Sequence, residues 1–121
     1  MSKQAASILL VINSDPASSN AYQAWSLCAA LQRQQQSVHV FFNQQAVTHA
    51  QAPAALERDC LALHTAYAEL ALAASKPVSL LVCRAAWTRR SATALASPWQ
   101  SSGLAELAEL TQSVDRIVSF S

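Results

Sequence analysis

The residue with the clearest potential for chemistry is Cys83, which stands where an apolar run of strand character gives way to a short helical segment. The run spans residues 78–82, and the segment that follows, residues 84–90, holds three arginines and no acidic residue. The N–H groups at the start of a helix and nearby cations both favour the charged form of a thiol. Because thiolates are nucleophiles, we expect this strand–helix junction to be the reactive part of the chain.

Three arginines follow the cysteine within that segment: Arg84, Arg89 and Arg90. A cation close to a thiol favours its ionised form, so each arginine can either activate Cys83 or receive an acidic partner. Arg84 is the nearest in sequence, and we expect it to act on the thiol. The alternative for each arginine is a solvated helix face without a chemical role.

The remaining cysteines and the histidines are weaker candidates for a reactive group. Cys28 and Cys60 fall within the apolar stripes of two helical segments, and we expect both to be packed in the core. His49 follows a strand-like run and is expected near the reactive cysteine, where an imidazole could carry a proton. The alternative for His49 is a structural role, which we also expect for His39, inside that run, and for His64, on a helix.

Composition and motif content exclude several classes of function. The chain has 121 residues and a net charge of +1, and its basic residues are scattered, so it lacks the electrostatic footprint of a nucleic-acid-binding protein. The cysteines show no spacing typical of metal ligands. Gly103, the only glycine, cannot supply the glycine-rich turn of a Rossmann or P-loop site. No signal peptide and no membrane-spanning apolar run are visible, so we expect no metal, no direct nucleic-acid contact and no membrane association.

Strand-like and helical segments alternate along the whole chain. Four segments have the length and apolar content of strands: residues 7–13, 37–43, 78–82 and 114–120, of which the first is a continuous apolar run. Four segments have helical spacing of apolar residues or helical composition: residues 21–35, 56–75, 84–90 and 103–111. Continuous apolar runs are typical of strands that are covered on both faces. The alternation predicts a single α/β domain over residues 1–121, a three-layer sandwich in which helices cover both faces of a mainly parallel, four- to five-stranded sheet.

The segment after the arginines carries less information. Residues 91–100 show no sustained periodicity, and we expect a loop there with a turn at Ala92–Ala96. The helix that follows is amphipathic, and its spacing predicts that Leu104, Leu107 and Ala108 face inward.

The predicted topology also indicates where a site would lie. In open parallel sheets, sites are found beyond the carboxyl ends of the strands. This rule places Ser14–Ser19, Asn43–His49 and Cys83 along one rim of the sheet.

Three segments in order resemble the TusD/DsrE family of sulfur-relay proteins. The first is the strand ending in Val40–Asn43, which is followed by Ala46–Ala50 and is similar to the family's strand and rim loop. The second is Leu80–Arg90, where the family has a strand, the sulfur-carrying cysteine, an alanine-rich turn and paired arginines. The third runs from Ser102–Leu104 to Asp115–Phe120 and is similar to the family's carboxyl-terminal motif. The resemblance spans nearly the whole chain.

The resemblance implies a DsrE-like fold and a function in sulfur transfer. It implies that Cys83 carries sulfur as a persulfide and that no cofactor is needed, and from their positions we expect Arg84, Arg89, Arg90 and His49 to stabilise the thiolate or bind a partner. It also implies a cytoplasmic sulfurtransferase that assembles with related small subunits into a hetero- or homo-oligomer and meets sulfur donor and acceptor proteins. The low share of charged residues, 12%, independently favours association between subunits.

Two branches of the family and one non-catalytic role remain open. The relayed sulfur serves tRNA 2-thiouridine synthesis in one branch and sulfur oxidation in the other. The connection between Cys83 and Ser102 is shorter than in typical TusD proteins. The alternative to a carrier is therefore a non-catalytic scaffold subunit of a DsrE-type oligomer, in which Cys83 is packed and unreactive.

Overall fold

The structure is a computed structural model that describes residues 6–91 and 93–121. Its centre is one sheet of five parallel strands in the order β4-β3-β2-β1-β5. The strands are β1 (Ser7–Ile12), β2 (Ser37–Phe42), β3 (Ser79–Cys83), β4 (Trp99–Ser102) and β5 (Arg116–Phe120). The predicted α/β fold with a mainly parallel sheet is confirmed.

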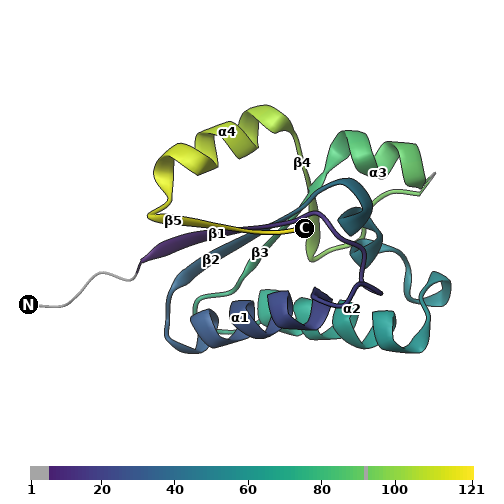
Figure 1. Cartoon of the computed structure of the whole chain (residues 1–121), viewed down its shortest axis with the longest axis horizontal. Helices are drawn as coiled ribbons and strands as arrows, with labels where there is room; N and C mark the ends of the chain where they lie inside the picture. The colour runs from purple at the N-terminus through teal and green to yellow at the C-terminus, as the bar shows by residue number, and fades with distance from the viewer. Residues whose placement is uncertain (1–5, 92) are drawn as a thin grey trace, which may run out of the picture.

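Helices lie on both faces of the sheet and complete three layers (Figure 1). They are α1 (Ala21–Arg33), α2 (Arg58–Ala71), α3 (Arg84–Arg90) and α4 (Leu104–Ser113), with two short 3-10 helices, η1 (Gln44–Ala50) and η2 (Pro53–Ala55). Helices α1 and α2 cover one face, and α4 lies over the other (Figure 1). Helix α3 follows β3 directly and packs against η1 at the carboxyl rim of the sheet.

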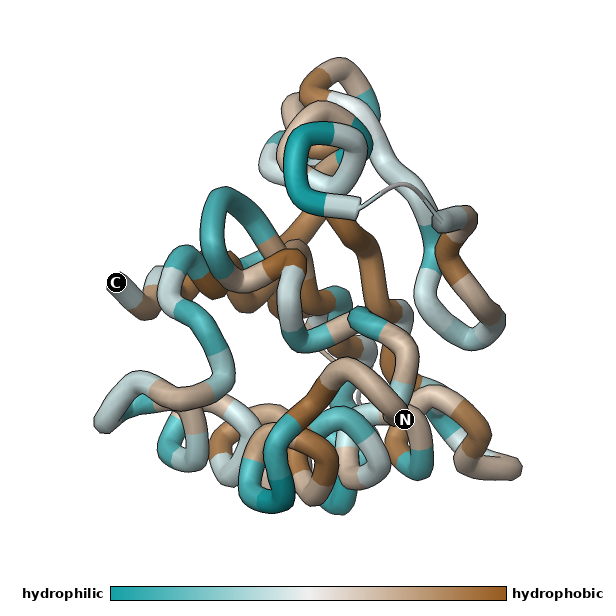
Figure 2. Tube along the Cα trace, turned by 90° about the vertical axis from the view of Figure 1, so that its right-hand side faces the viewer, coloured by the Kyte–Doolittle hydropathy of each residue, from teal (hydrophilic) through white to brown (hydrophobic). Residues whose placement is uncertain are grey.

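The core is built around β1 and β2, two of the three inner strands of the sheet. Leu9, Leu10 and Ile12 of β1 and Val40 and Phe41 of β2 are fully buried. Most side chains on both faces of β1 are shielded, which explains its continuous apolar sequence, whereas β2 begins with an alternation in which Ser37 and His39 are half-buried. Much of the apolar chain accordingly runs through the middle of the molecule, as the brown segments in Figure 2 show.

Two details of the fold differ from the expectation. The segment expected as a loop ends in a fifth strand, β4, which pairs with β3 at the edge of the sheet. Only Trp99 and Ser102 of this four-residue strand are buried, so it lacks an apolar run that sequence reasoning could detect. The turn expected at Ala92–Ala96 begins at residue 92, outside the described residues, and residues 93–98 form no helix.

Helix α4 also faces the sheet differently from the prediction. Leu104 is 67% exposed and Ala108 is exposed as well, whereas Leu107 and Leu110 pack against the core together with Val114, which follows the helix. The inward stripe is thus Leu107–Leu110–Val114, at i, i+3 and i+7, one of the spacings that a helix face allows. The prediction for Leu104 and Ala108 was wrong because the helix is rotated about its axis relative to the assumed stripe.

Within the described residues, no helix has the length and apolar character needed to cross a membrane.

Candidate functional site

Cys83 is the last residue of β3 and immediately precedes α3. Its thiol is free, and the residue is 6% exposed and joins the main hydrophobic cluster. In the sheet it pairs with Ser102 of β4. The first N–H groups of a helix lack intrahelical acceptors, and the Cys83 side chain makes no capping hydrogen bond to those of α3. Cys83 thus sits at the carboxyl rim, where the sequence places it, with only a small part of the residue open to solvent.

An open hollow adjoins the sheet face on which Cys83 lies. Side chains two residues apart on a strand share a face, so Cys83 shares its face with Leu81 and Ser79. Both of these residues, with Ser102, line a hollow of about 390 Å³ that runs between β3 and α4. Cys83 itself does not line this hollow, although its strand neighbour Ser102 does.

Arg84 turns toward β4 and α4. Its Nε donates a hydrogen bond of 3.1 Å to Oγ of Ser101, and its Nη2 lies 3.6 Å from Oε1 of Glu106. The two charged side chains are 60% and 56% exposed, so their attraction is screened by water and contributes little to stability. The ion pair nevertheless holds the guanidinium at the edge of the site, one residue away from Cys83.

Glu106 links this arginine to the start of α4. Its Oε1 accepts a 3.1 Å hydrogen bond from the backbone N–H of Gly103, and its Oε2 lies 3.4 Å from the Ser102 hydroxyl, which donates to it. A glutamate at the third helical position that reaches back to the N-cap is half of a capping box. The same carboxylate therefore fixes the helix start and the position of Arg84. We did not single out Glu106, Ser101 or Ser102 from the sequence, although a glutamate three residues after Gly103 is a capping signal that could have found Glu106.

The other two arginines diverge from Arg84. Arg89 and Arg90 are both exposed. Arg90 lines a separate hollow of about 360 Å³ together with Asp15, Thr48 and Cys60, on the side of the loops that follow β1 and β2. Arg84 and Arg90 therefore face different neighbours, and Arg84 is the one held beside β4.

His49 lies in the interior and not on an exposed rim. It is fully buried in η1, and its ring packs against Phe42 at a centroid distance of 5.1 Å and against Tyr67 at 5.7 Å. Within the described residues, neither ring nitrogen has a well-formed hydrogen bond. Burial lowers the pKa of His49 to about 4, which the main chain of Ser14 and the charge of Asp15 counteract only in part.

An imidazole in this state cannot exchange protons readily with solvent near neutral pH. Its neighbours Phe42, Tyr67 and Trp99 form an aromatic cluster, in which Phe42 lies 5.1 Å from Trp99. His64 stacks on Trp99 at 5.2 Å and approaches the His49 carbonyl oxygen through its Nδ1, at 2.8 Å. The environment of His49 fits the structural alternative and offers no path for a proton carrier.

The two other cysteines differ in their surroundings. Cys28 is fully buried in the core, and burial raises the pKa of its thiol to about 12. Cys60 is 9% exposed and lies outside the main hydrophobic cluster, in the walls of two hollows. Burial, followed by the charges of Glu57, Asp15 and Asp59, raises its pKa, so its thiol stays neutral. The expectation of core packing is thus confirmed for Cys28 and only partly met for Cys60.

Among the described residues, no group of three or more histidine, cysteine, aspartate or glutamate side chains is arranged to hold a metal ion.

Comparison with known proteins gives a family match and a structural match. A profile described as the DsrE/DsrF-like family matches residues 6–120. No curated protein matches the chain. Among solved structures, the crystal structure of the YchN protein from E. coli superposes with a TM-score of 0.74 at 23% sequence identity, over 95% of this chain and 99% of that chain. At this identity the likeness shows a common fold.

Proposed function

Because this chain belongs to the DsrE/DsrF-like family, a family associated with sulfur relay, we propose that it is a sulfur-relay subunit that accepts sulfur as a persulfide on Cys83 and passes it on. Supporting this proposal is one observation above all: the cysteine that ends β3 at the carboxyl rim of the sheet is a free thiol at the junction of β3 and α3. Sites in parallel α/β sheets lie at this rim. Cys28 and Cys60 belong to helices α1 and α2 and do not end a strand.

The proposed reaction is an exchange between sulfur atoms without net oxidation. The Cys83 thiolate attacks the terminal sulfur of a donor persulfide, and a bond forms between Sγ and that sulfur. The sulfur–sulfur bond of the donor breaks, and its electron pair leaves with the donor cysteine as a thiolate. A thiolate of the acceptor protein then attacks the outer sulfur of the Cys83 persulfide, and Cys83 leaves as a thiolate. Thiolate fraction, leaving group and access set the rates, as in thiol–disulfide exchange.

We further propose that the arginines at the rim have different roles. Arg84 stabilises the anionic sulfur from the edge of the site, where Ser101 and Glu106 hold it. Arg89 and Arg90 are exposed and suit contact with an acidic surface of a donor or acceptor protein. His49 has no part in this scheme, because it is buried.

The expected setting is a reducing compartment such as the cytoplasm, since the three cysteines are free. The expected partners are related small subunits and the donor and acceptor of the sulfur. The acceptor belongs to tRNA 2-thiouridine synthesis or to sulfur oxidation.

One observation favours a second candidate. Cys83 is only 6% exposed, and a packed cysteine is usually a structural one. The alternative is a non-catalytic scaffold subunit of the same fold, whose surface positions an active relative.

Loading with radiolabelled sulfur separates the two candidates. We expect the native protein, mixed with a persulfide donor, to take up about one sulfur atom per chain. The Cys83→Ser variant should take up none, while the matched Cys60→Ser variant should load like the unmodified protein. Uptake that persists in folded Cys83→Ser would reject Cys83 as the carrier, and no uptake by the unmodified protein would favour the scaffold.

A further inference from the structure

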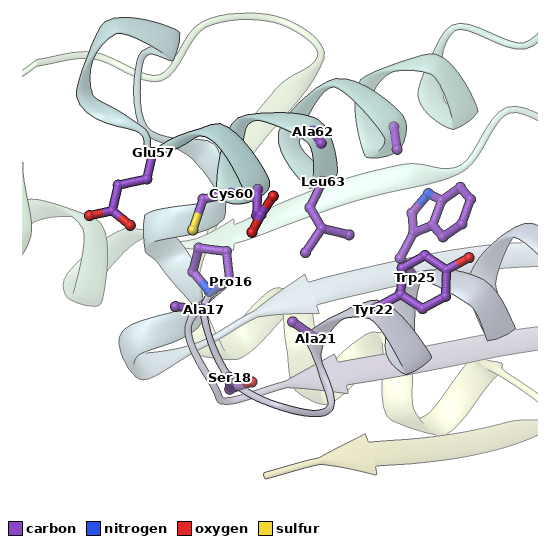
Figure 3. Close-up of a pocket in the computed structure, with 12 residues that line it drawn as sticks. Pro16, Ala17, Ser18, Ala21, Tyr22, Trp25, Glu57, Cys60, Ala62 and Leu63 are labelled. Atoms are coloured by element: carbon purple, nitrogen blue, oxygen red, sulfur yellow. The ribbon is translucent and has the colours of Figure 1, made fainter.

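A third hollow lies between α1 and α2, and Cys83 is not among the residues that line it. It has a volume of about 630 Å³ and is lined by side chains from both helices and by the loop at residues 16–18. We call it the α1–α2 cleft. Its size falls in the range of small-molecule sites, roughly 300–1,000 Å³, and the side chains of the two helices point toward one another across it (Figure 3).

The two ends of the cleft differ in chemistry. Tyr22 and Trp25 form one end, where their rings lie 5.6 Å apart and are tilted by 43° (Figure 3). Glu57 and Cys60 form the other end, and Leu63 projects into the space between the ends (Figure 3). The walls thus change from aromatic, through aliphatic, to acidic along the cleft.

The charge of the cleft has one sign. Glu57 and Asp59 both line it, and among the described residues no lysine, arginine or histidine does. In the described part of the chain, neither carboxylate lies within 4.0 Å of a cationic group. Burial first, and then the charges of Glu57, Asp15 and Asp59, raise the pKa of the Cys60 thiol, so these carboxylates act on the cleft wall. A cationic group bound at this end would therefore meet two carboxylates that have no cationic partner within the described chain.

We propose that the α1–α2 cleft binds a small organic amine: an ammonium head at Glu57 and Asp59, and an apolar or aromatic body against Leu63, Tyr22 and Trp25. Apolar walls with a few placed polar groups are the usual design of a small-molecule site. The two carboxylates select a cation over a neutral or anionic head of the same size. The aromatic rings favour a flat apolar body. This site is independent of sulfur transfer, because Cys83 does not line the cleft.

Phenylbutylamine is a suitable probe, with phenylbutanol and phenylbutyrate as neutral and anionic ligands of similar size. Isothermal titration with the full chain should show saturable binding of the amine. The alcohol should bind about ten-fold more weakly, since it forgoes two partly screened charge interactions, and the carboxylate more weakly still. Bound amine should also slow the alkylation of Cys60, which lies in the cleft wall.

Substitutions test whether the ligands bind at the residues of the α1–α2 cleft. Combining Glu57→Gln with Asp59→Asn should abolish the preference for the amine over the alcohol, and Trp25→Leu should weaken both ligands. Glu69→Gln, a matched change at an exposed carboxylate of α2 outside the cleft, should bind like the unmodified protein, as should Cys83→Ser. Equal affinity for amine and alcohol, a preference that survives the double substitution, or no saturable binding of the amine would overturn the proposal.

Discussion

Acidification is expected to destabilise the fold through His49, the histidine that is fully buried among Phe42 and Tyr67. Burial lowers its pKa from 6.5 to about 4, so the folded protein holds this imidazole in its neutral form. The opposing influences, the Ser14 main chain and the charge of Asp15, are smaller, and the neighbouring His64 adds to the lowering. Between these two pKa values, His49 is therefore protonated in the unfolded chain and neutral in the folded chain.

The sign and size of the effect follow from these two pKa values. Above pH 6.5 the imidazole is neutral in both the folded and the unfolded chain, and the full stability is present. As the pH falls toward about 4, the unfolded chain binds a proton that the folded chain cannot bind. Each pH unit between these two pKa values lowers the free energy of unfolding by about 1.4 kcal/mol, so the total loss should be about 3 kcal/mol. That is a large part of the roughly 5–15 kcal/mol typical of a domain.

Urea unfolding at a series of pH values measures this loss, with His49→Gln as the comparison. The substitution removes one titrating group, while His39, whose pKa is also lowered by burial, titrates in both proteins. The test is the difference between the two slopes with pH, which is insensitive to the absolute stability of the variant. Parallel curves for the two proteins between about pH 6.5 and 4 would refute the reasoning.

Three further predictions concern the rim and α4. Arg84→Glu should slow alkylation of Cys83 and shift its pH profile upward, because an anion beside the thiol disfavours the thiolate; Arg89→Glu is the matched control, and equal effects of the two changes would argue against a specific role. Glu106→Ala should lower the free energy of unfolding by about 1 kcal/mol in a urea titration, since the helix loses its capping carboxylate; an unchanged midpoint would contradict this role. Leu104→Ser should change that free energy by less than about 0.5 kcal/mol, because the side chain is 67% exposed; a loss well above this would mean that Leu104 is covered in solution.

Strand and helix alternation carried most of the information on the fold. The apolar run within residues 7–13 is uninterrupted because β1 is shielded on both faces, and such a run is typical of a parallel sheet. Edge strand β4 escaped detection because it is four residues long and only half buried. The orientation of α4 was misjudged because a leucine- and alanine-rich helix offers several overlapping apolar stripes, and packing against the sheet selects one of them.

Only those features of the candidate site that depend on local sequence were predictable. The rim position of Cys83 follows directly from the end of an apolar run. The side-chain directions of Arg84 and Arg90, which turn to different neighbours, depend on β4 and on the loop at residues 15–17, both distant in sequence. The burial of His49 depends on Phe42 and Tyr67, and Tyr67 is brought to it by tertiary packing. Local patterns contain no signal for contacts of this kind.

Peptide mass spectrometry of the native protein after exposure to a persulfide donor identifies the cysteine that carries the sulfur. We predict that the peptide containing Cys83 gains the mass of one sulfur atom, while the peptides containing Cys28 and Cys60 remain unmodified. Added sulfur on Cys60 or Cys28 with none on Cys83, or no added sulfur on any of the three, would contradict this prediction.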